Sequence, residues 1–204
     1  MSRAATVYVV DDDSSTRELL AWLMKRHDLP VQAFPDARSF LHAYRPGDPG
    51  CLVLDLNMPG MGGLELQQYL KEHGVVLPLV FVSGRADVPK AVRAVKEGAI
   101  DFIEKPFDYK RVVELVRECL ARDAAARTAR GEREEIRARL AHLTLREREV
   151  MDLVVAGRIN RDIAESLAIS VKTVEAHRAH VMEKLGADSV AGLVQAVLAA
   201  RVAP

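Results

Sequence analysis

The chain has 204 residues, of which 49% are hydrophobic and 28% charged, a composition typical of a soluble globular protein. This length favours two compact domains, or one domain with an appendage. Basic and acidic residues are equally numerous, 29 of each, so the formal net charge is zero. That balance excludes a highly charged tail or coat.

The sequence offers no segment that is long and apolar enough to cross a membrane. Its longest uncharged apolar run, Val75 to Gly84, falls well short of the roughly 18 apolar residues that a membrane span requires. Three aspartates at positions 11 to 13 precede any hydrophobic region of a signal peptide, so we expect a cytoplasmic chain with no membrane association. Cys51 and Cys119 have no further Cys or His at ligand spacing, which indicates buried, reduced thiols.

Residues 1 to 122, the first predicted domain, alternate short apolar runs with segments of helical period. This alternation predicts the α/β class: a doubly wound, five-stranded parallel sheet with its ligand site at the carboxyl ends of the strands. Ser15 followed by Glu18 predicts a capping box at the first helix. The expected strands are Thr6 to Val10, Gln32 to Phe34, Cys51 to Leu54, Leu79 to Val82 and Asp101 to Ile103. The expected helices are Ser15 to His27, Asp36 to Tyr44, Leu64 to Glu72, Val88 to Glu97, and one from Asp108 onward.

Residues 123 to 139 are predicted to form a helical linker. They contain five Arg and four Asp or Glu, and Ile136 is their only large apolar residue. Helix propensity is high apart from Gly131. The segment is either a solvated spacer or a dimerising coiled coil, because Leu115, Leu120, Ile136 and Leu140 give an incomplete heptad.

Residues 140 to 204 carry no strand pattern and predict a small bundle of four short helices. Thr144 and Glu147 form a capping box at the first of these helices, which Gly157 ends. The predicted caps of the other three helices are Asn160, Ser170 and Ser189. Eight basic and eight acidic residues give this segment a net charge of zero, so we expect its non-specific affinity for nucleic acid to be modest.

Acidic side chains follow two strands that are neighbours in the predicted sheet. Asp11 and Asp12 come directly after the first strand, and Asp55 comes directly after the third. If the three carboxylates converge, each like-charge pair at about 4 Å costs about 4 kcal/mol at an effective dielectric constant of about 20. Only a cation makes such a cluster stable, and oxygen ligands of this kind suit Mg²⁺ best. For Asp55 alone, an ordinary loop carboxylate would be the preferred interpretation.

Two further groups change that interpretation. Lys105 follows the fifth strand and Ser83 follows the fourth, so an ammonium and a hydroxyl border the same crevice. Carboxylate, metal, ammonium and hydroxyl are the groups that phosphoryl transfer to a carboxylate requires. Asp55 is the predicted nucleophile because it stands alone at its strand end, and Asp11 and Asp12 are left to hold the metal.

Four segments of this domain together resemble the signature of a response-regulator receiver domain. They are VVDDD at 9–13, LDLNMPG at 54–60, SG at 83–84 and KPF at 105–107. The resemblance implies Asp55 as phospho-acceptor, Asp11 and Asp12 as Mg²⁺-site acids, the Asn57 backbone carbonyl as another ligand, and Ser83 and Lys105 as phosphate-sensing groups. It also implies a cis peptide at Lys105-Pro106 and a switch role for Phe102, for which ordinary core packing remains the alternative. Asn57 and Arg85 would border the path of hydrolytic water.

The second half of the chain has its own characteristic pattern. NRDIAESLAISVKTVE at 160–175 places a small Ala at a helix centre and a short turn before the next helix, as in helix-turn-helix proteins. Its apolar residues Ile163, Ala164, Leu167, Ile169 and Val174 can face one core. With LTLREREV at 143–150 and the residues from 177 to 185, the segment resembles the LuxR-type DNA-binding domain of the NarL/FixJ family. GAIDF at 98–102 and KPF at 105–107 resemble the FixJ-like branch of that family.

The helix from Val171 to Leu185 is the predicted DNA-reading element. Steps of 100° per residue from a buried Val174 also place Val181, Leu185 and the stem of Arg178 inward. The opposite arc holds Lys172, Glu175, Ala176, Ala179 and Glu183, and Thr173, His180 and Lys184 lie on a flank suited to phosphates. Glu175 is the predicted base reader, since a Glu can accept from cytosine N4; a merely solvated Glu is the alternative. We expect His177 and His180 to pack or to flank phosphates rather than to bind metal.

These patterns predict a phosphorylation-dependent transcriptional regulator, not an enzyme beyond its own Mg²⁺-dependent phosphorylation and dephosphorylation. The expected partners are a sensor histidine kinase, promoter DNA, RNA polymerase and, on phosphorylation, a second copy of the chain. One rival is a phosphate-shuttling receiver whose helical domain binds protein. Another is an aspartyl-phosphate hydrolase, for which Asp13 is the only candidate acid or base.

Overall fold

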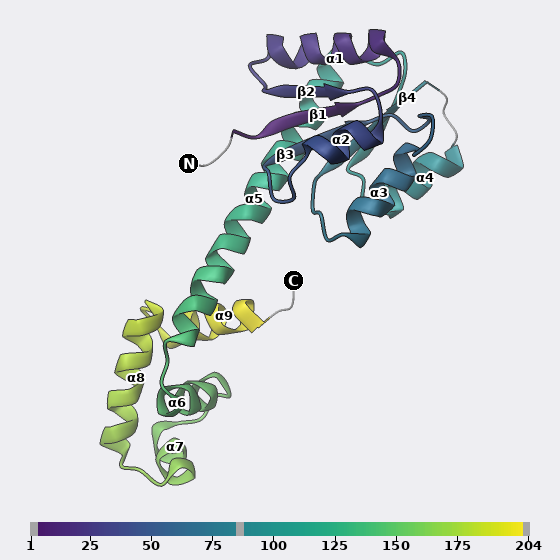
Figure 1. Ribbon diagram of the computed structural model, residues 1–204. Helices are drawn as coiled ribbons and strands as arrows, with labels where there is room; N and C mark the ends of the chain where they lie inside the picture. The colour runs from purple at the N-terminus through teal and green to yellow at the C-terminus, as the bar shows by residue number, and fades with distance from the viewer. Residues whose placement is uncertain (1–3, 85–87, 202–204) are drawn as a thin grey trace. The chain divides into compact units, whose positions relative to one another are not determined.

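The chain forms two compact units, Met1–Ala126 and Arg127–Pro204 (Figure 1). Each unit has its own hydrophobic core. The computed structural model describes residues 4–84 and 88–201, so Arg85 lies outside the described residues. Within these ranges, no helix has the length and apolar character needed to cross a membrane.

The first unit is built on a five-stranded parallel sheet in the order β2-β1-β3-β4-β5, which confirms the predicted fold class. The strands are β1 (Thr6–Val10), β2 (Val31–Phe34), β3 (Gly50–Leu54), β4 (Leu79–Ser83) and β5 (Asp101–Glu104). Their bounds lie within one residue of those predicted. The central strands β3 and β4 are buried along their whole length, as their continuous apolar sequences require in a sheet covered on both faces.

Helices cover both faces of this sheet (Figure 1). On one face, β1, β3 and β4 pack against α2 (Ala37–Ala43), α3 (Gly63–Glu72) and α4 (Val88–Lys96). On the other face, the alternate residues of the same strands pack against α1 (Ser14–Arg26) and the first turns of α5 (Tyr109–Ala141). Both cysteines are buried and free, as predicted. A hydrogen bond with the Cys119 thiol and burial together hold the pKa of Cys51 well above its usual range.

The start of α1 differs from the prediction. Asp13, not Ser15, is the N-cap, and its carboxylate accepts hydrogen bonds from the backbone N–H groups of Ser15 and Thr16. Asp and Ser cap helices equally well, so residue type alone does not favour Ser15 over Asp13. The extended backbone of Asp13 decides between them, and Ser15 becomes an ordinary first-turn residue.

Helix α5 runs without interruption from Tyr109 to Ala141 and includes the whole predicted linker. Asp123 is buried, and its carboxylate accepts a hydrogen bond of 3.0 Å from the Gly50 backbone N–H. A side chain at Gly50 would meet the Thr6 carbonyl oxygen, and its φ of +154° also favours glycine. The first residue of the predicted linker therefore packs as part of the receiver-like unit.

The second unit contains the end of α5 and four further helices: α6 (Leu145–Val155), α7 (Asn160–Leu167), α8 (Val171–Leu185) and α9 (Val190–Arg201). The Thr144–Glu147 capping box and the Ser170 cap form as predicted, and the chain leaves α6 at Gly157 with a φ of +78°. The Asn160 cap is wrong: Ile159 is the N-cap, without a side-chain bond, and the Asn160 Oδ1 accepts from Arg178 instead. The Arg139 guanidinium donates to the carbonyl of Leu185, the last residue of α8.

Candidate functional site

Three of the predicted residues meet at the carboxyl edge of the first unit's sheet. Asp11 follows β1, Asp55 follows β3 and Lys105 follows β5. The Lys105 Nζ lies 2.7 Å from the Asp11 Oδ2 and 3.2 Å from the Asp55 Oδ1. Asp11 and Asp55 are 2% and 6% exposed, so one ammonium bridges two buried carboxylates.

Burial and charge oppose each other at this bridge. Burial raises the pKa of Asp11 above its ordinary value, although the hydrogen bond from Lys105 works in the opposite direction. Burial would lower the pKa of Lys105, but its bond to Asp11 and the charges of both carboxylates raise it overall. The Lys105 side chain therefore stays cationic at neutral pH, and the ionised form of Asp11 would gain from a further cation.

Ser83 and Asn57 border the same carboxylate. The Asp55 Oδ2 accepts from the Asn57 backbone N–H at 2.7 Å, and the Asn57 side-chain amide donates to the Ser83 Oγ at 3.3 Å. Ser83 is fully buried. Gly63 lets α3 approach this loop closely, because a Cβ there would lie 2.2 Å from the Asp55 carbonyl oxygen. The two oxygens of Asp55 thus face Lys105 and the Ser83–Asn57 pair.

The remaining receiver predictions concern the strand that ends next to Ser83. Phe102 in β5 is half-buried and packs against the core cluster that α2, α3 and α4 share. The peptide between Lys105 and Pro106 is cis, as the resemblance implies. Phe102 is thus in core contact on the α4 side of the sheet, a position that suits packing and switching alike.

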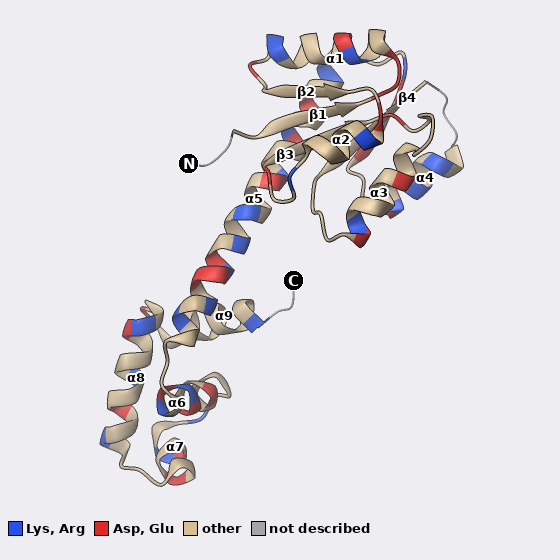
Figure 2. Cartoon of the chain, in the orientation of Figure 1, with Lys and Arg blue, Asp and Glu red and all other residues tan. Residues whose placement is uncertain are grey.

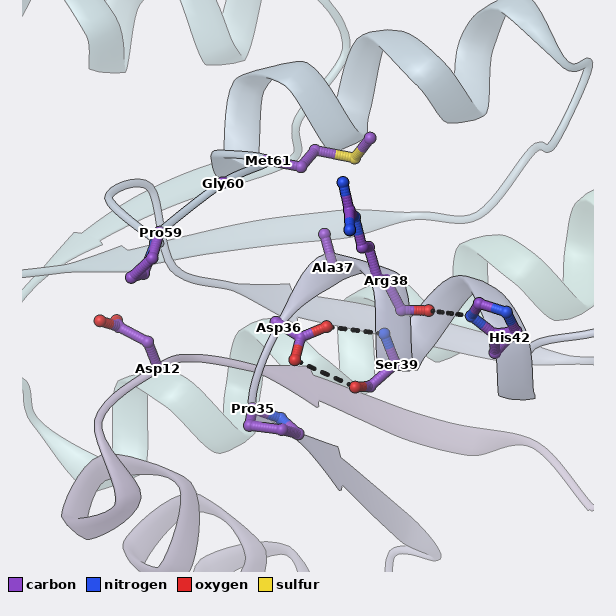
Figure 3. A pocket seen from close by; sticks show the side chains of 10 residues that line it. All are labelled: Asp12, Pro35, Asp36, Ala37, Arg38, Ser39, His42, Pro59, Gly60 and Met61. Atoms are coloured by element: carbon purple, nitrogen blue, oxygen red, sulfur yellow. Dashed lines mark hydrogen bonds between the residues drawn. The ribbon is translucent and has the colours of Figure 1, made fainter.

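Asp12 does not take part in the Lys105 bridge between Asp11 and Asp55. Its side chain is exposed and lines a separate cavity of about 750 Å³ between the β1–α1 loop, the start of α2 and the loop before α3. Figure 3 shows Asp12 beside Pro59 at one end of this cavity, away from His42 at the other. Within residues 4–84 and 88–201, no three acidic, His or Cys side chains gather at metal-ligand spacing. The cation that joins Asp11 and Asp55 in this structure is the Lys105 ammonium.

The donor chemistry nevertheless fits Mg²⁺. Asp11 and Asp55 offer carboxylate oxygens, the exposed Asp12 lies next to Asp11 in the chain, and the Asn57 backbone offers a carbonyl. These are hard oxygen donors, the type that Mg²⁺ takes. Asp13 is not available for such a role. Its carboxylate caps α1 and accepts from the Thr16 hydroxyl at 2.7 Å, and this bond lowers its pKa.

In the second unit, α8 presents the predicted outward face. Val174, Val181 and Leu185 are buried, as the 100° steps require. The predicted DNA-contacting side chains are all exposed: Lys172, Thr173, Glu175, Ala176, Ala179, His180 and Lys184. The exposed face mixes both charges with small residues.

Two members of that set have another partner. The Lys184 Nζ lies 2.7 Å from the Glu147 Oε2 in α6, and the His180 Nδ1 lies 4.0 Å from the Glu147 Oε1. The hydrogen bond from Lys184 and those from Thr144 lower the pKa of Glu147 to about 2. Lys184 is therefore held in a bridge between α6 and α8, which leaves it less free to bind phosphate than the prediction assumed.

A basic cavity next to Glu175 was not predicted from the sequence. It has a volume of about 640 Å³, and Arg158, Arg161 and Arg178 line it together with Glu175 and Asn160. Arg178 is positioned by its 2.8 Å bond to the Asn160 Oδ1. Arg158 precedes α7 and Arg178 lies in the middle of α8, so only the folded arrangement of the two helices brings these charges together. In Figure 2, basic and acidic residues are interspersed along the helices of the second unit. Because their charges cancel, the net charge of this unit did not indicate the cluster.

Comparisons with known proteins agree with both halves of this description. Residues 7–117 match the response regulator receiver domain, and residues 141–197 match the luxR family of bacterial regulatory proteins. The chain is 43% identical to the transcriptional regulatory protein FixJ of Azorhizobium caulinodans over 204 residues, which cover 100% of this chain and 97% of FixJ.

Two solved structures extend the comparison to the fold. The response regulator StyR matches with a TM-score of 0.84 and 40% identity, over 96% of this chain and 99% of StyR. Full-length FixJ from B. japonicum matches with a TM-score of 0.59 and 38% identity, over 96% of this chain and 97% of FixJ. The chain therefore belongs to the response regulators that join a receiver domain to a LuxR-type DNA-binding domain, as a FixJ-like, phosphorylation-dependent transcriptional regulator.

Proposed function

We propose that Asp55 accepts the phosphoryl group from a sensor histidine kinase. The observation that carries this proposal is the contact of the Asp55 Oδ1 with the Lys105 ammonium, at 3.2 Å, in a buried setting. An Asp55 oxygen attacks phosphorus in line, a P–O bond forms, and the P–N bond to the kinase histidine breaks with its electron pair going to the imidazole nitrogen. Lys105 neutralises the charge that develops on the phosphoryl oxygens.

Asp11, Asp12, Asp55 and the backbone carbonyl of Asn57 would hold Mg²⁺ during this reaction. The bound cation supplies charge neutralisation for the phosphoryl oxygens. The raised pKa of Asp11, caused by burial, supports this assignment because a buried carboxylate of this kind is stabilised by added positive charge. Only this aspartyl chemistry is assigned to the chain, and we assign it no enzymatic turnover of other substrates.

Ser83 and Phe102 are the groups that would sense the new phosphate. Ser83 is buried at the end of β4 and linked to Asp55 through Asn57, while Phe102 packs in the neighbouring strand on the α4 side. A phosphate can shift the receiver only through contacts that differ between its two states. We propose that these contacts favour a homodimer, with residues 1–122 as receiver, 123–139 as linker and 140–204 as DNA-binding domain.

The DNA-binding proposal rests on the exposed face of α8. Lys172, Glu175, Ala176 and Ala179 would face the major groove, with Thr173 and His180 toward a phosphate flank. Because Lys184 is bridged to Glu147, we add Arg158 and Arg161 as phosphate contacts on the opposite flank. The chain would act on promoter DNA in the cytoplasm, together with RNA polymerase.

Both rival functions lack support in the described residues. A protein-binding helical domain would be favoured by an outward acidic or apolar face on α8, and that face is mixed. An aspartyl-phosphate hydrolase would need Asp13 as acid or base, and Asp13 instead caps α1 through both carboxylate oxygens.

The experiment is phosphorylation of the full chain by acetyl phosphate and Mg²⁺, read by intact mass. Asp55→Asn should abolish the added mass of one phosphoryl group, because the amide cannot act as the nucleophile. Asp28→Asn, an exposed change in the same unit, is the matched control and should be labelled like the parent. Undiminished, base-labile labelling of Asp55→Asn would show that another residue is the acceptor.

A further inference from the structure

Lys90, in the first turn of α4, reaches the loop that follows β3. Its Nζ lies 3.5 Å from the Oδ1 of Asn57, the residue two positions after Asp55. Both Lys90 and Asn57 are exposed. Helix α4 thus contributes an ammonium to the loop that begins at the proposed phospho-acceptor, in addition to the Lys105 ammonium from the end of β5.

The Asn57 side-chain amide also contacts Ser83. Its Nδ2 donates to the Ser83 Oγ at 3.3 Å, and the Asn57 backbone N–H donates to the Asp55 Oδ2 at 2.7 Å. The two ends of the amide therefore have different partners: the oxygen faces Lys90, and the nitrogen faces Ser83. Asn57 in this way connects the exposed ammonium of α4 with the buried end of β4.

The charge of Lys90 favours this orientation of the amide. A lysine ammonium has donors and no acceptor, so it attracts the amide oxygen and repels the NH₂ group. A hydrogen bond of 3.5 Å is long, but the preference for the oxygen depends on the sign of the charge and not on ideal geometry. If the amide were reversed, its NH₂ group would face the ammonium and its oxygen would face the Ser83 Oγ.

The orientation of the amide determines what the Ser83 hydroxyl can do. A hydroxyl can donate its one hydrogen and accept at its oxygen at the same time. While Asn57 donates to Ser83, the Ser83 hydrogen is not needed by Asn57 and can be donated to a phosphoryl oxygen on Asp55. With the amide reversed, the Asn57 oxygen would compete with the phosphoryl oxygens, which are acceptors, for that hydrogen.

We propose that Lys90 is a positioning residue for the phosphoryl group on Asp55. It holds the Asn57 amide so that Asn57 donates to Ser83 and Ser83 donates to the phosphoryl group. Hydrogen bonds in such a chain strengthen one another, and the last of them has a charged acceptor. The proposal rests on Asp55 as the acceptor and Ser83 as the phosphate-sensing group, and it requires no contact between Lys90 and the phosphoryl group.

The test is the affinity of the full chain for beryllofluoride, a phosphoryl mimic that binds to an aspartate, measured by ¹⁹F NMR with Mg²⁺ present. Lys90→Met should weaken binding about fivefold, because the charge that orients the amide is lost while the side chain stays unbranched. Lys90→Arg should restore binding to within about twofold of the parent, since a guanidinium also has donors only. Lys96→Met is the matched control: Lys96 is exposed at the other end of α4, and its loss should leave affinity unchanged.

Direct attraction between Lys90 and the phosphoryl group would give the same results for these variants, so two further backgrounds are needed. In Asn57→Ala the amide is absent, and in Ser83→Ala the hydroxyl is absent. In either background Lys90→Met should therefore change affinity by less than about twofold. Asn57 is exposed, so its variant decides the question if Ser83→Ala fails to fold. A fivefold loss that persists in either background would overturn the proposal.

Equal affinity of the parent and Lys90→Met, or failure of Lys90→Arg to restore binding, would also overturn the proposal. Asp55→Asn separates the role of Lys90 from the identity of the acceptor, because this variant should not bind beryllofluoride at all. If Asp55→Asn binds like the parent, the acceptor assignment is wrong, and the role of Lys90 falls with it. If binding requires Asp55 but is the same with and without Lys90, only the role of Lys90 is wrong.

Discussion

Two lysine–carboxylate bridges, one in each unit, have opposite electrostatic character. In the receiver, Lys105 joins Asp11 and Asp55, and burial raises the pKa of Asp11. In the helical unit, Lys184 bonds Glu147, which also receives hydrogen bonds from Thr144, and the pKa of Glu147 falls to about 2. The first carboxylate cluster is poorly compensated by its surroundings, whereas the second is fully satisfied.

This electrostatic difference distinguishes a proposed binding site from a structural contact. At the receiver edge, one ammonium serves two buried carboxylates, and this leaves room for a second cation and a phosphoryl group to improve the electrostatics. At Glu147, a capping box and a lysine satisfy one carboxylate and tie α6 to α8. A lysine–carboxylate contact thus belongs to the proposed phosphorylation site in one unit and to a structural bridge in the other.

The largest stability effect is expected for Lys105→Ala. Removing the ammonium leaves Asp11 and Asp55 buried without compensation, which should lower the free energy of unfolding of the receiver by about 3 kcal/mol. Added Mg²⁺ should restore much of that loss, since it replaces the missing positive charge, and should do less for the parent. Chemical denaturation with and without Mg²⁺ measures both effects; a variant as stable as the parent without Mg²⁺ would contradict the account.

Glu175→Ala tests the reading face of α8. Glu175 is exposed and lies beside the arginine cavity, where it can accept from cytosine N4. Its loss should relax discrimination at one base pair per half-site by about 1 to 3 kcal/mol. Selection of binding sites from random DNA measures this, with Glu183→Ala, further along the exposed arc, as the matched control. An unchanged preference at every position would show that Glu175 reads no base.

Glu147→Gln tests the structural bridge through pH. The pKa of Glu147 is lowered in the folded state, so its stabilisation is present above its usual pKa of 4.5 and is lost as pH falls from there toward about 2. The variant should be less stable than the parent by about 1 kcal/mol at pH 6, and the two should converge near pH 2. Thermal unfolding across this range gives the comparison; a difference that persists undiminished at the acid end would rule out the charge as its source.

Salt dependence of DNA binding should show the smallest effect. Arg161→Ala should reduce the slope of log affinity against log salt by about 1, because one phosphate contact is lost. Lys172→Ala, at the amino end of the exposed arc of α8, should also reduce the slope. Lys184→Ala should lower stability while leaving the slope unchanged, since Lys184 is engaged with Glu147. A reduced slope for Lys184→Ala would place this lysine on phosphate instead.

Much of the fold and of the receiver site follows from the sequence for a physical reason. Buried parallel strands are apolar throughout, and their carboxyl ends meet at one edge, so the order of residues along the chain is enough to group Asp11, Asp55, Ser83 and Lys105. Strand bounds were accurate because a charged or turn residue follows each apolar run.

The errors arose where local sequence leaves several choices or where the deciding partner is distant. Asp13 and Ser15 are both suitable N-cap residue types, and Asp13 is the cap because its backbone is extended. The Lys184 partner, Glu147, lies 37 residues away and belongs to another helix, so helical periodicity alone could not reveal the bridge. The arginine cavity was missed for the same reason, since α7 and α8 contribute to it only after they pack.

The most direct test of the central claim is DNA binding by the full chain before and after treatment with acetyl phosphate and Mg²⁺, with Asp55→Asn treated in parallel. Bound fragments are recovered and sequenced, and affinity for the selected site is then measured at fixed salt. We predict that phosphorylation raises the affinity of the parent by about tenfold and raises its dimer fraction together with it, while Asp55→Asn does not respond. Equal affinity of the parent in both states, or an equal rise for Asp55→Asn, would contradict control of DNA binding through this site.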